Sequence, residues 1–217
     1  VDGSGHVAVY SGAASVGQGL ETTLAQICAE ELRIGVEAVT VIHGDSALVP
    51  FGVGGFASRG AMVAGSAVFE ASRKLKTKML AVAAGLLEAH PDDLVLENGR
   101  ISVRGLPERS VSFRDLARAA APGQRLPPGM EPGLSATHFF EAPKMSYPYG
   151  THVAVVEVDP ETGRVSLLKY AIAYDIGRAI NPMIVEGQLV GAWLGGALEP
   201  ARGEGSRRAW QLGGRRG

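Results

Sequence analysis

Two short stretches of glycine and small residues carry the strongest chemical signal in this sequence of 217 residues. Residues 12–19 read GAASVGQG and residues 52–60 read GVGGFASRG, and we refer to them as the first and second glycine loops. Each loop stands directly before a predicted helix, and the free N–H groups at a helix N-terminus attract anions. The missing side chains also let an extended ligand lie against the backbone. The loops therefore predict a site for a flat, polar, phosphorylated ligand, with ordinary strand-to-helix turns as the alternative.

Three side chains in the loops suit such a ligand. The Gln18 amide can donate and accept hydrogen bonds toward the edge of a heterocycle. Ser58 and Arg59 suit a phosphate or another anionic oxygen, although Ser58 is equally suited to be a plain helix N-cap. The spacing GxGxxA over residues 52–57 is a weak dinucleotide-binding signal. The acidic residue that such a site needs about 20 positions later would fall inside a predicted helix instead of ending a strand.

Other common catalytic and metal-binding patterns are absent from the sequence. It holds no GxxxxGK[ST], no GxSxG and no HExxH, and no two histidines stand within four residues of each other. Cys28 is the only cysteine and falls on the apolar face of a predicted helix, which indicates a core residue. A lone cysteine excludes an internal disulfide and fits the reducing cytoplasm. We therefore assign no catalytic residue and no metal ligand, and we expect a cytoplasmic protein.

Each glycine loop is predicted to connect a strand to a helix. Residues 7–11 and 39–43 predict strands, and helices are expected over 20–33 and 58–90. The first half of the second helix is small and nearly uncharged, which predicts burial on most of its sides. Its second half is amphipathic, and the predicted apolar face consists of Val68, Leu75, Met79, Val82 and Leu86.

The remaining segments predict further strands, turns and helices. They are a hairpin over 94–103 turning at Asn98-Gly99, a helix over 113–120 capped by Ser112, a Pro/Gly-rich connection over 122–133, a strand over 134–140, a hairpin with strands 152–158 and 165–174, and a helix from Asn181-Pro182 to Leu198. This mixture predicts an α+β fold with mixed sheets and a long buried helix. Residues 1–199 form one predicted domain, and residues 200–217, rich in Arg and Gly, are expected to be a disordered tail.

The composition excludes several function classes. With 46% hydrophobic and 20% charged residues, the chain can form a core, which excludes disorder of the whole chain. The net charge of −1 provides no basic field for nucleic acid. No apolar run approaches the roughly 20 residues that a membrane span requires. We therefore expect neither a nucleic-acid partner nor a membrane partner.

Four motifs, in order along the chain, resemble the large subunits of molybdenum hydroxylases. Residues 17–22 are similar to the loop GQG-x-[ET]-T of that family, and residues 44–60 to G-D-[TS]…P…G-x-x-[AG]-S-R. Residues 152–163 resemble its hairpin H-x-A-x-V-E-V-D-x-x-T-G, and residues 175–188 its D-x-G…N-P…GQ segment. The family comprises xanthine dehydrogenase, aldehyde oxidase and aerobic carbon monoxide dehydrogenase. The resemblance spans about residues 3–191 and is closest to the carbon monoxide dehydrogenase-like and the general aldehyde dehydrogenase-like large subunits.

The resemblance implies that this chain is a fragment of the molybdopterin-binding domain of such a subunit. The family binds a molybdopterin dinucleotide with molybdenum, often in the cytosine form. Gln18 matches the family's glutamine that contacts the cofactor, and Ala57 and Ser58 match the loop beside the molybdenum and the pterin phosphate. The candidate cofactor-binding residues are Gly17, Gln18, Gly19, Phe56, Ala57, Ser58 and Arg59.

The resemblance also implies an activity and partners. Members are molybdenum-dependent oxidoreductases that oxidise an aldehyde, a purine-like heterocycle or carbon monoxide, with water as the oxygen source. Electrons leave through iron–sulfur and FAD modules on other domains or subunits. The expected partners are therefore the remainder of the large subunit, the iron–sulfur and flavin subunits and a small-molecule substrate.

Two departures from the family pattern bear on catalysis. The family's base glutamate stands in a late G-x-G-E loop beyond this chain, and Glu204, in a similar Gly-Glu-Gly setting, comes too early to match it. The second cofactor glutamine is absent from residues 187–198. We expect a piece of a longer protein, inactive in isolation, whose tail reflects a truncated or frame-shifted reading of the gene. The alternatives are a non-catalytic interaction module that completes a split large subunit and, more remotely, a nucleotide-binding α/β domain.

Overall fold

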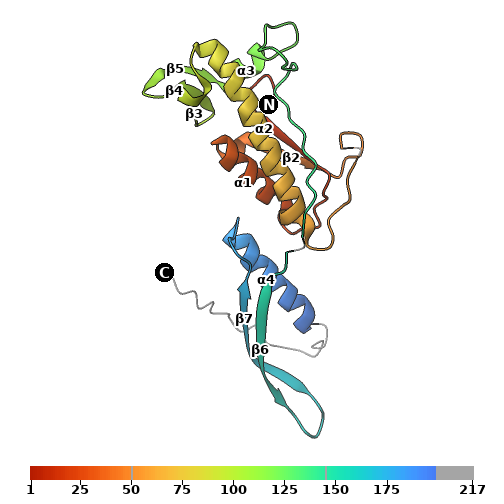
Figure 1. Cartoon of the computed structure of the whole chain (residues 1–217). Helices are drawn as coiled ribbons and strands as arrows, with labels where there is room; N and C mark the ends of the chain where they lie inside the picture. The colour runs from red at the N-terminus through yellow and green to blue at the C-terminus, as the bar shows by residue number, and fades with distance from the viewer. Residues whose placement is uncertain (50, 145, 199–217) are drawn as a thin grey trace. The chain divides into compact units, whose positions relative to one another are not determined.

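The computed structural model describes residues 1–49, 51–144 and 146–198, with the backbone alone for 193–198 (Figure 1). The chain divides into two compact units, which are described separately. Unit 1 comprises Val1–Gly150 and Tyr174–Ile180, and unit 2 comprises Thr151–Ala173 and the residues from Asn181 onward. The predicted tail, residues 200–217, lies outside the described residues.

Unit 1 begins with a parallel strand–helix–strand arrangement. Strand β1 (Val7–Ser11) leads through the first glycine loop into α1 (Leu20–Leu32), and a short η1 turn (Val36–Ala38) precedes β2 (Val39–His43). The two strands pair in parallel, from Val7 opposite Val39 to Ser11 opposite His43. Both strands therefore end at the same edge, and both glycine loops follow from that edge. The three predicted elements are confirmed.

The second helix starts later than predicted and in a wider form. It opens with a π-helical turn, η2 (Gly60–Gly65), and continues as α2 (Ser66–Leu87). The prediction of a start at Ser58 is wrong, because Ala57 and Ser58 have φ angles of 54° and 53° and lie in the left-handed region. Ser58 is therefore no N-cap, and no side chain caps η2. The helix also ends three residues early, where Glu88 takes a left-handed φ of 46°.

Helix α2 buries one face, largely as predicted. Its buried residues are Val68, Ser72, Leu75, Met79, Val82, Ala83 and Leu87. The prediction that Leu86 belongs to this face is wrong, because Leu86 is 48% exposed. Positions spaced by four residues from Met79, namely Ala83 and Leu87, face the core instead. In η2 only Gly65 is buried, so the predicted burial of this segment on most sides is also wrong within unit 1.

A three-stranded antiparallel sheet follows α2 after the short η3 turn (Pro91–Asp93). Its strands are β3 (Leu94–Glu97), β4 (Arg100–Val103) and β5 (Leu106–Ser112). The predicted turn is confirmed, with positive φ angles of 49° and 68° at Asn98 and Gly99. Strand β5 was not predicted, because its first half is exposed and lacks an alternating apolar pattern.

Helix α3 (Phe113–Ala119) begins with the predicted cap. The Ser112 hydroxyl accepts a hydrogen bond from the Asp115 N–H at 3.2 Å, and the Asp115 carboxylate accepts one from the Ser112 N–H at 3.4 Å. These reciprocal bonds form a capping box. The Asp115 carboxyl consequently has a lowered pKa, chiefly through its hydrogen bond with the Ser112 hydroxyl.

The segment after α3 runs back along α2 without forming the predicted strand over 134–140 (Figure 1). Its carbonyl groups bond to other partners: the Leu134 carbonyl accepts from the Val1 ammonium at 2.7 Å, and the Thr137 carbonyl accepts from Lys74 Nζ at 3.5 Å. Leu134 is buried against the core. An apolar extended segment becomes a strand only where a sheet edge is available, and these bonds take its place here.

The core of unit 1 lies between α1, α2, the β3–β5 sheet and α3. Its most enclosed large side chains are Leu24, Leu32, Met79, Ile101 and Leu116. Cys28 is also buried in this core, as predicted, and burial raises the pKa of its thiol.

Unit 2 contains most of a long hairpin and the last helix. Strands β6 (Tyr149–Val158) and β7 (Val165–Asp175) confirm the predicted hairpin and extend it by three residues at the start of β6. Helix α4 (Pro182–Leu198) starts at the predicted cap, where Asn181 Oδ1 accepts from the Ile184 N–H at 3.1 Å. Among the helices of the described residues, none is both long and apolar enough to cross a membrane.

Candidate functional site

The two glycine loops lie against each other through their backbones. The Gly54 N–H donates to the Gly12 carbonyl at 3.4 Å. A Cβ atom at Gly52 would stand 2.4 Å from the Gly12 carbonyl oxygen, and one at Gly55 would stand 2.4 Å from the Ala14 carbonyl oxygen. Such distances do not occur between real atoms, so this close approach requires glycine at both positions. The structure therefore brings together the two loops that the sequence singled out separately.

The helices that follow the loops also begin side by side. A Cβ atom at Gly60, the first residue of η2, would lie 3.5 Å from Leu20 Cδ1 at the start of α1. Further along, a Cβ atom at Gly65 would lie 3.0 Å from Ile27 Cδ1. The two helices thus run in the same direction, and their N-termini meet at the carboxyl edge of β1 and β2. In parallel sheets this edge is the usual place for a ligand.

Gln18 directs its amide nitrogen toward the second loop. Its Oε1 accepts hydrogen bonds from the Val16 N–H at 2.7 Å and from the Ser15 hydroxyl at 3.4 Å, which fixes the orientation of the amide. Nε2 then lies 3.8 Å from where a Cβ of Gly55 would stand and donates to no described residue. This leaves a half-buried donor between the two loops.

A group of polar side chains, Ser15, Glu21 and His43, lies next to Gln18. Glu21 Oε1 lies 2.7 Å from His43 Nε2, which joins the start of α1 to the end of β2. The pKa of Glu21 is lowered by its own backbone N–H, by His43 and by the Ser15 hydroxyl. Ser15 is therefore near both Glu21 and Gln18, and its single hydroxyl proton can be donated to only one of them at a time. The contact between Glu21 and His43 was not predicted from the sequence, because His43 was interpreted only as a strand residue.

This arrangement also changes the expected role of the α1 N-terminus. Glu21 stands in the first turn of α1, and its own N–H lowers the pKa of its carboxyl, so a negative charge lies at the helix end that was predicted to be open to an anion. Gly19 caps α1 in a left-handed conformation without a side-chain bond. Gly17 also has a positive φ, and a Cβ there would meet nothing within 4 Å. The space next to the first loop is therefore on the side of Gly17, not directly above the helix end.

The second loop presents the only positive charge of the two loops. The Arg59 guanidinium lies 5.4 Å from the centre of the Phe56 ring, and no described acidic residue pairs with it. Ala57 and Ser58 are exposed in left-handed conformations, which cost about 1–2 kcal/mol per residue for side chains other than glycine. Strained residues of this kind concentrate at binding sites. The loop therefore offers a hydroxyl group and an unpaired cation to a ligand.

Exposed aromatic rings border the loops and were not predicted from the sequence. Phe51 precedes the second loop and packs edge-to-face on Phe139, with 6.4 Å between ring centres. Both rings remain about three-quarters exposed, at 74% and 75%. Exposed apolar groups next to a polar site indicate a surface that a ligand or another part of the protein covers.

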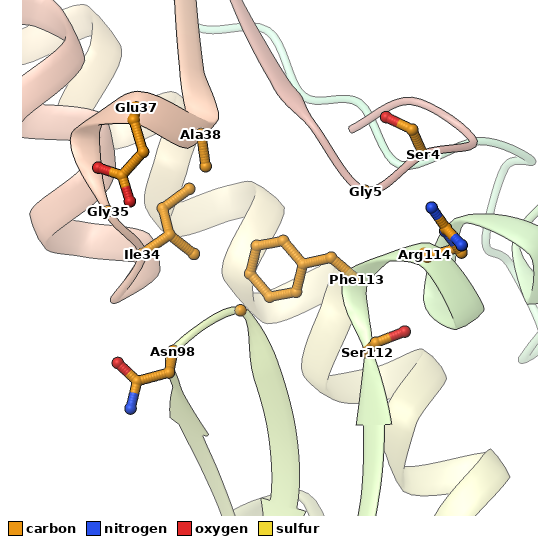
Figure 2. A pocket seen from close by; sticks show the side chains of 11 residues that line it. Ser4, Gly5, Ile34, Gly35, Glu37, Ala38, Asn98, Ser112, Phe113 and Arg114 are labelled. Carbon is orange, nitrogen blue, oxygen red and sulfur yellow. The ribbon is translucent and has the colours of Figure 1, made fainter.

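A separate hollow of about 570 Å³ lies elsewhere in unit 1 (Figure 2). Figure 2 shows the Phe113 ring at its centre, between Ile34, which follows α1, and Arg114 of α3. The hollow adjoins the C-terminal end of α1, whereas Gln18 precedes its N-terminal end, and a helix of 13 residues is about 20 Å long. This hollow is therefore not the site formed by the glycine loops. No group of three or more His, Cys, Asp or Glu able to hold a metal occurs among the described residues.

Comparison with known proteins shows which family this sequence matches. The sequence model of the family described as "Molybdopterin cofactor-binding domain" matches residues 1–197. The chain is 40% identical to the 6-hydroxypseudooxynicotine dehydrogenase complex subunit gamma of Paenarthrobacter nicotinovorans, over 91% of this chain and 25% of that protein. It is 39% identical to the carbon monoxide dehydrogenase large chain of Afipia carboxidovorans, over 87% of this chain and 23% of that protein.

Solved structures give the same picture. A Cu,Mo-CO dehydrogenase matches with a TM-score of 0.77 and 38% identity, over 88% of this chain and 24% of that chain. Quinoline 2-oxidoreductase from Pseudomonas putida 86 matches with a TM-score of 0.76 and 35% identity, over the same shares of 88% and 24%. The chain thus spans about a quarter of the length of the proteins it matches.

Proposed function

Because the chain belongs to the molybdopterin cofactor-binding domain family, we propose that its two glycine loops together hold a molybdopterin dinucleotide with molybdenum. The observation that carries this proposal is the contact between the loops. The Gly54 N–H bonds to the Gly12 carbonyl, and Gln18 Nε2 points toward Gly55. One ligand can therefore touch both loops at once.

The residues present fit such a cofactor. Its phosphates need N–H, hydroxyl and cationic partners, which Ser58 and Arg59 supply. Its flat heterocycle needs an amide donor and an open backbone, which Gln18 and Gly17 supply. The acidic residue in the first turn of α1, Glu21, is paired with His43 Nε2 at 2.7 Å. The assigned binding residues are Gly17, Gln18, Gly19, Phe56, Ala57, Ser58 and Arg59.

We place the chain in the large subunit of a molybdenum hydroxylase. When bound, the cofactor supplies the oxidation of an aldehyde, a purine-like heterocycle or carbon monoxide, with water as the oxygen source. The residues of this chain bind and orient the cofactor, and none is assigned a proton-transfer role. For that reason the isolated chain is expected to be inactive. The names of its relatives, which include a nicotine 6-hydroxylase large subunit, support the class of reaction and leave the substrate open.

The remaining features of the assembly are part of the same proposal. The cofactor is the cytosine dinucleotide, and electrons pass to iron–sulfur and FAD groups on partner domains or subunits. The partners are the remainder of the large subunit and the iron–sulfur and flavin subunits. The single cysteine, buried and unpaired, agrees with a cytoplasmic location.

The second candidate function is a non-catalytic module that completes a split large subunit. The exposed apolar strands of unit 2 favour it, because such surfaces mark contacts with other polypeptides. The two functions differ in one observable. A cofactor-binding domain loses molybdenum when its loops are altered, whereas a purely structural module does not.

Replacement of Gln18 tests the proposal. In the purified large subunit that contains this chain, Gln18→Ala should lower the molybdenum content per polypeptide. The loss of one hydrogen bond, worth about 1.5 kcal/mol, corresponds to roughly tenfold weaker binding. The matched control is Gln124→Ala, an exposed glutamine on the loop after α3. A Gln18→Ala protein that keeps the molybdenum content of the control would contradict the proposal.

A further inference from the structure

The residues of unit 2 whose side chains are described form no buried core. Among its residues with described side chains, 151–173 and 181–192, none is buried. Strands β6 and β7 are 10 and 11 residues long, about twice the usual length. A two-stranded hairpin is at best marginally stable in water, and its open edges offer unpaired N–H and C=O groups. The hairpin therefore needs a further strand or a covering layer.

Both faces of the hairpin are apolar. Val155 and Val156 are neighbours in β6 and therefore point to opposite faces, and they are 47% and 48% exposed. A strand with one solvated face would alternate apolar and polar residues. Instead, exposed apolar side chains occur on both faces, namely Val153, Val155, Val156, Val158, Val165, Leu167 and Leu168. Only Glu157 and Lys169 carry charge within residues 151–158 and 165–173.

Helix α4 also exposes a surface that is suited to burial. It carries one charged residue, Glu186, in 17 residues. Cβ atoms at Gly187 and Gly191 would meet no atom within 4 Å, so the face of α4 that carries these two glycines borders open space. A helix with so few charged residues is typical of an interior position. The hairpin and the helix thus both present surfaces suited to a buried environment.

We propose that both faces of the hairpin between Thr151 and Ala173 are covered by the part of the large subunit outside these 217 residues, which adds a β-strand to an open hairpin edge. This inference rests on the proposed place of the chain in a large subunit. The relatives are about four times as long as the matched region, so they contain the polypeptide needed to cover the hairpin. A segment of the same subunit also meets the hairpin at a higher effective concentration than a second copy would.

Cysteine labelling in the intact large subunit tests this coverage. Val155→Cys and Val156→Cys each place a thiol on one face of the hairpin, and Leu86→Cys places one on unit 1 at a matched 48% exposure. The rate of maleimide labelling at each site is measured by peptide mass spectrometry and divided by the rate in the urea-unfolded protein. We expect at least tenfold protection at both valine positions and little at Leu86. Labelling at either valine position as fast as in the unfolded protein would overturn the proposal.

Two additional measurements in the same experiment, the dependence of labelling on protein concentration and the molybdenum content, distinguish the possible explanations. Protection that appears only at protein concentrations where large subunits dimerise would assign the hairpin to a second copy and would also overturn the proposal. Molybdenum is measured in the same preparations. Unprotected cysteines in a molybdenum-loaded subunit contradict this inference alone, whereas protected cysteines in a subunit that binds no molybdenum contradict only the proposed cofactor function.

Discussion

At the scale of single residues, the site depends on which way the Gln18 amide points. The bonds that Oε1 accepts from Val16 and Ser15 turn Nε2 toward the second loop, and the Glu21–His43 pair holds the same region from the other side. Gln18 was identifiable from the sequence because its flanking glycines stand out. Its supporting partners were not, because Ser15, Glu21 and His43 meet only when β1 and β2 pair in register.

The Glu21 pair predicts a particular response to pH. Hydrogen bonds from its own N–H, His43 and Ser15 hold the pKa of Glu21 below its ordinary value of 4.5. A depressed carboxyl pKa contributes stability above the ordinary value, and this contribution is lost as the pH falls through the folded-state pKa. Wild type should therefore be more stable than Glu21→Gln at pH 7, and the difference should shrink below pH 4.5.

Urea unfolding of the chain, followed by circular dichroism between pH 7 and pH 3, measures this difference. Glu30→Gln is a suitable control, since Glu30 is exposed and forms a surface ion pair with Arg33 at the end of α1. A stability difference between wild type and Glu21→Gln that stays constant down to pH 3 would contradict the account.

At the scale of elements, the apolar periodicity of the sequence was sufficient to predict helices and strands wherever the backbone has ordinary φ and ψ angles. It correctly predicted β1, α1, β2 and the hairpin turn at Asn98-Gly99. It failed at Ser58, because the sign of φ at two residues other than glycine leaves no mark in a hydrophobic pattern. It also failed for residues 134–140, where an extended segment bonds to a terminus and a lysine instead of a strand.

The contact between the loops gives the prediction at this scale. Gly52→Ala places a Cβ atom 2.4 Å from the Gly12 carbonyl oxygen, so the loops must separate. Cofactor binding should weaken by at least the roughly tenfold expected for Gln18→Ala, since both loops are displaced at once, and the molybdenum content should fall with it. Gly85→Ala in α2 is the control, because a Cβ there meets nothing within 4 Å and should stabilise the helix by about 0.5–1 kcal/mol. Equal molybdenum content in the two variants would argue against a shared site.

At the scale of the whole molecule, the two units differ in how much of their apolar surface is buried. Unit 1 has a continuous core around Leu24, Met79 and Ile101 and carries both glycine loops. Unit 2 has exposed strands and a helix with one charge, and the chain spans about a quarter of its relatives. The sequence indicated a fragment through its motifs. It could not indicate which surfaces lack a partner, because exposure depends on tertiary packing and not on local pattern.

The most direct test of the central claim is amide hydrogen exchange in the large subunit with and without its molybdenum cofactor. We expect residues 15–19 and 56–60 both to exchange at least tenfold more slowly when the cofactor is loaded. The hollow beside Phe113, about one α1 length away, should show no change. Slower exchange in only one of the loops, or in neither, would contradict a single cofactor held between them.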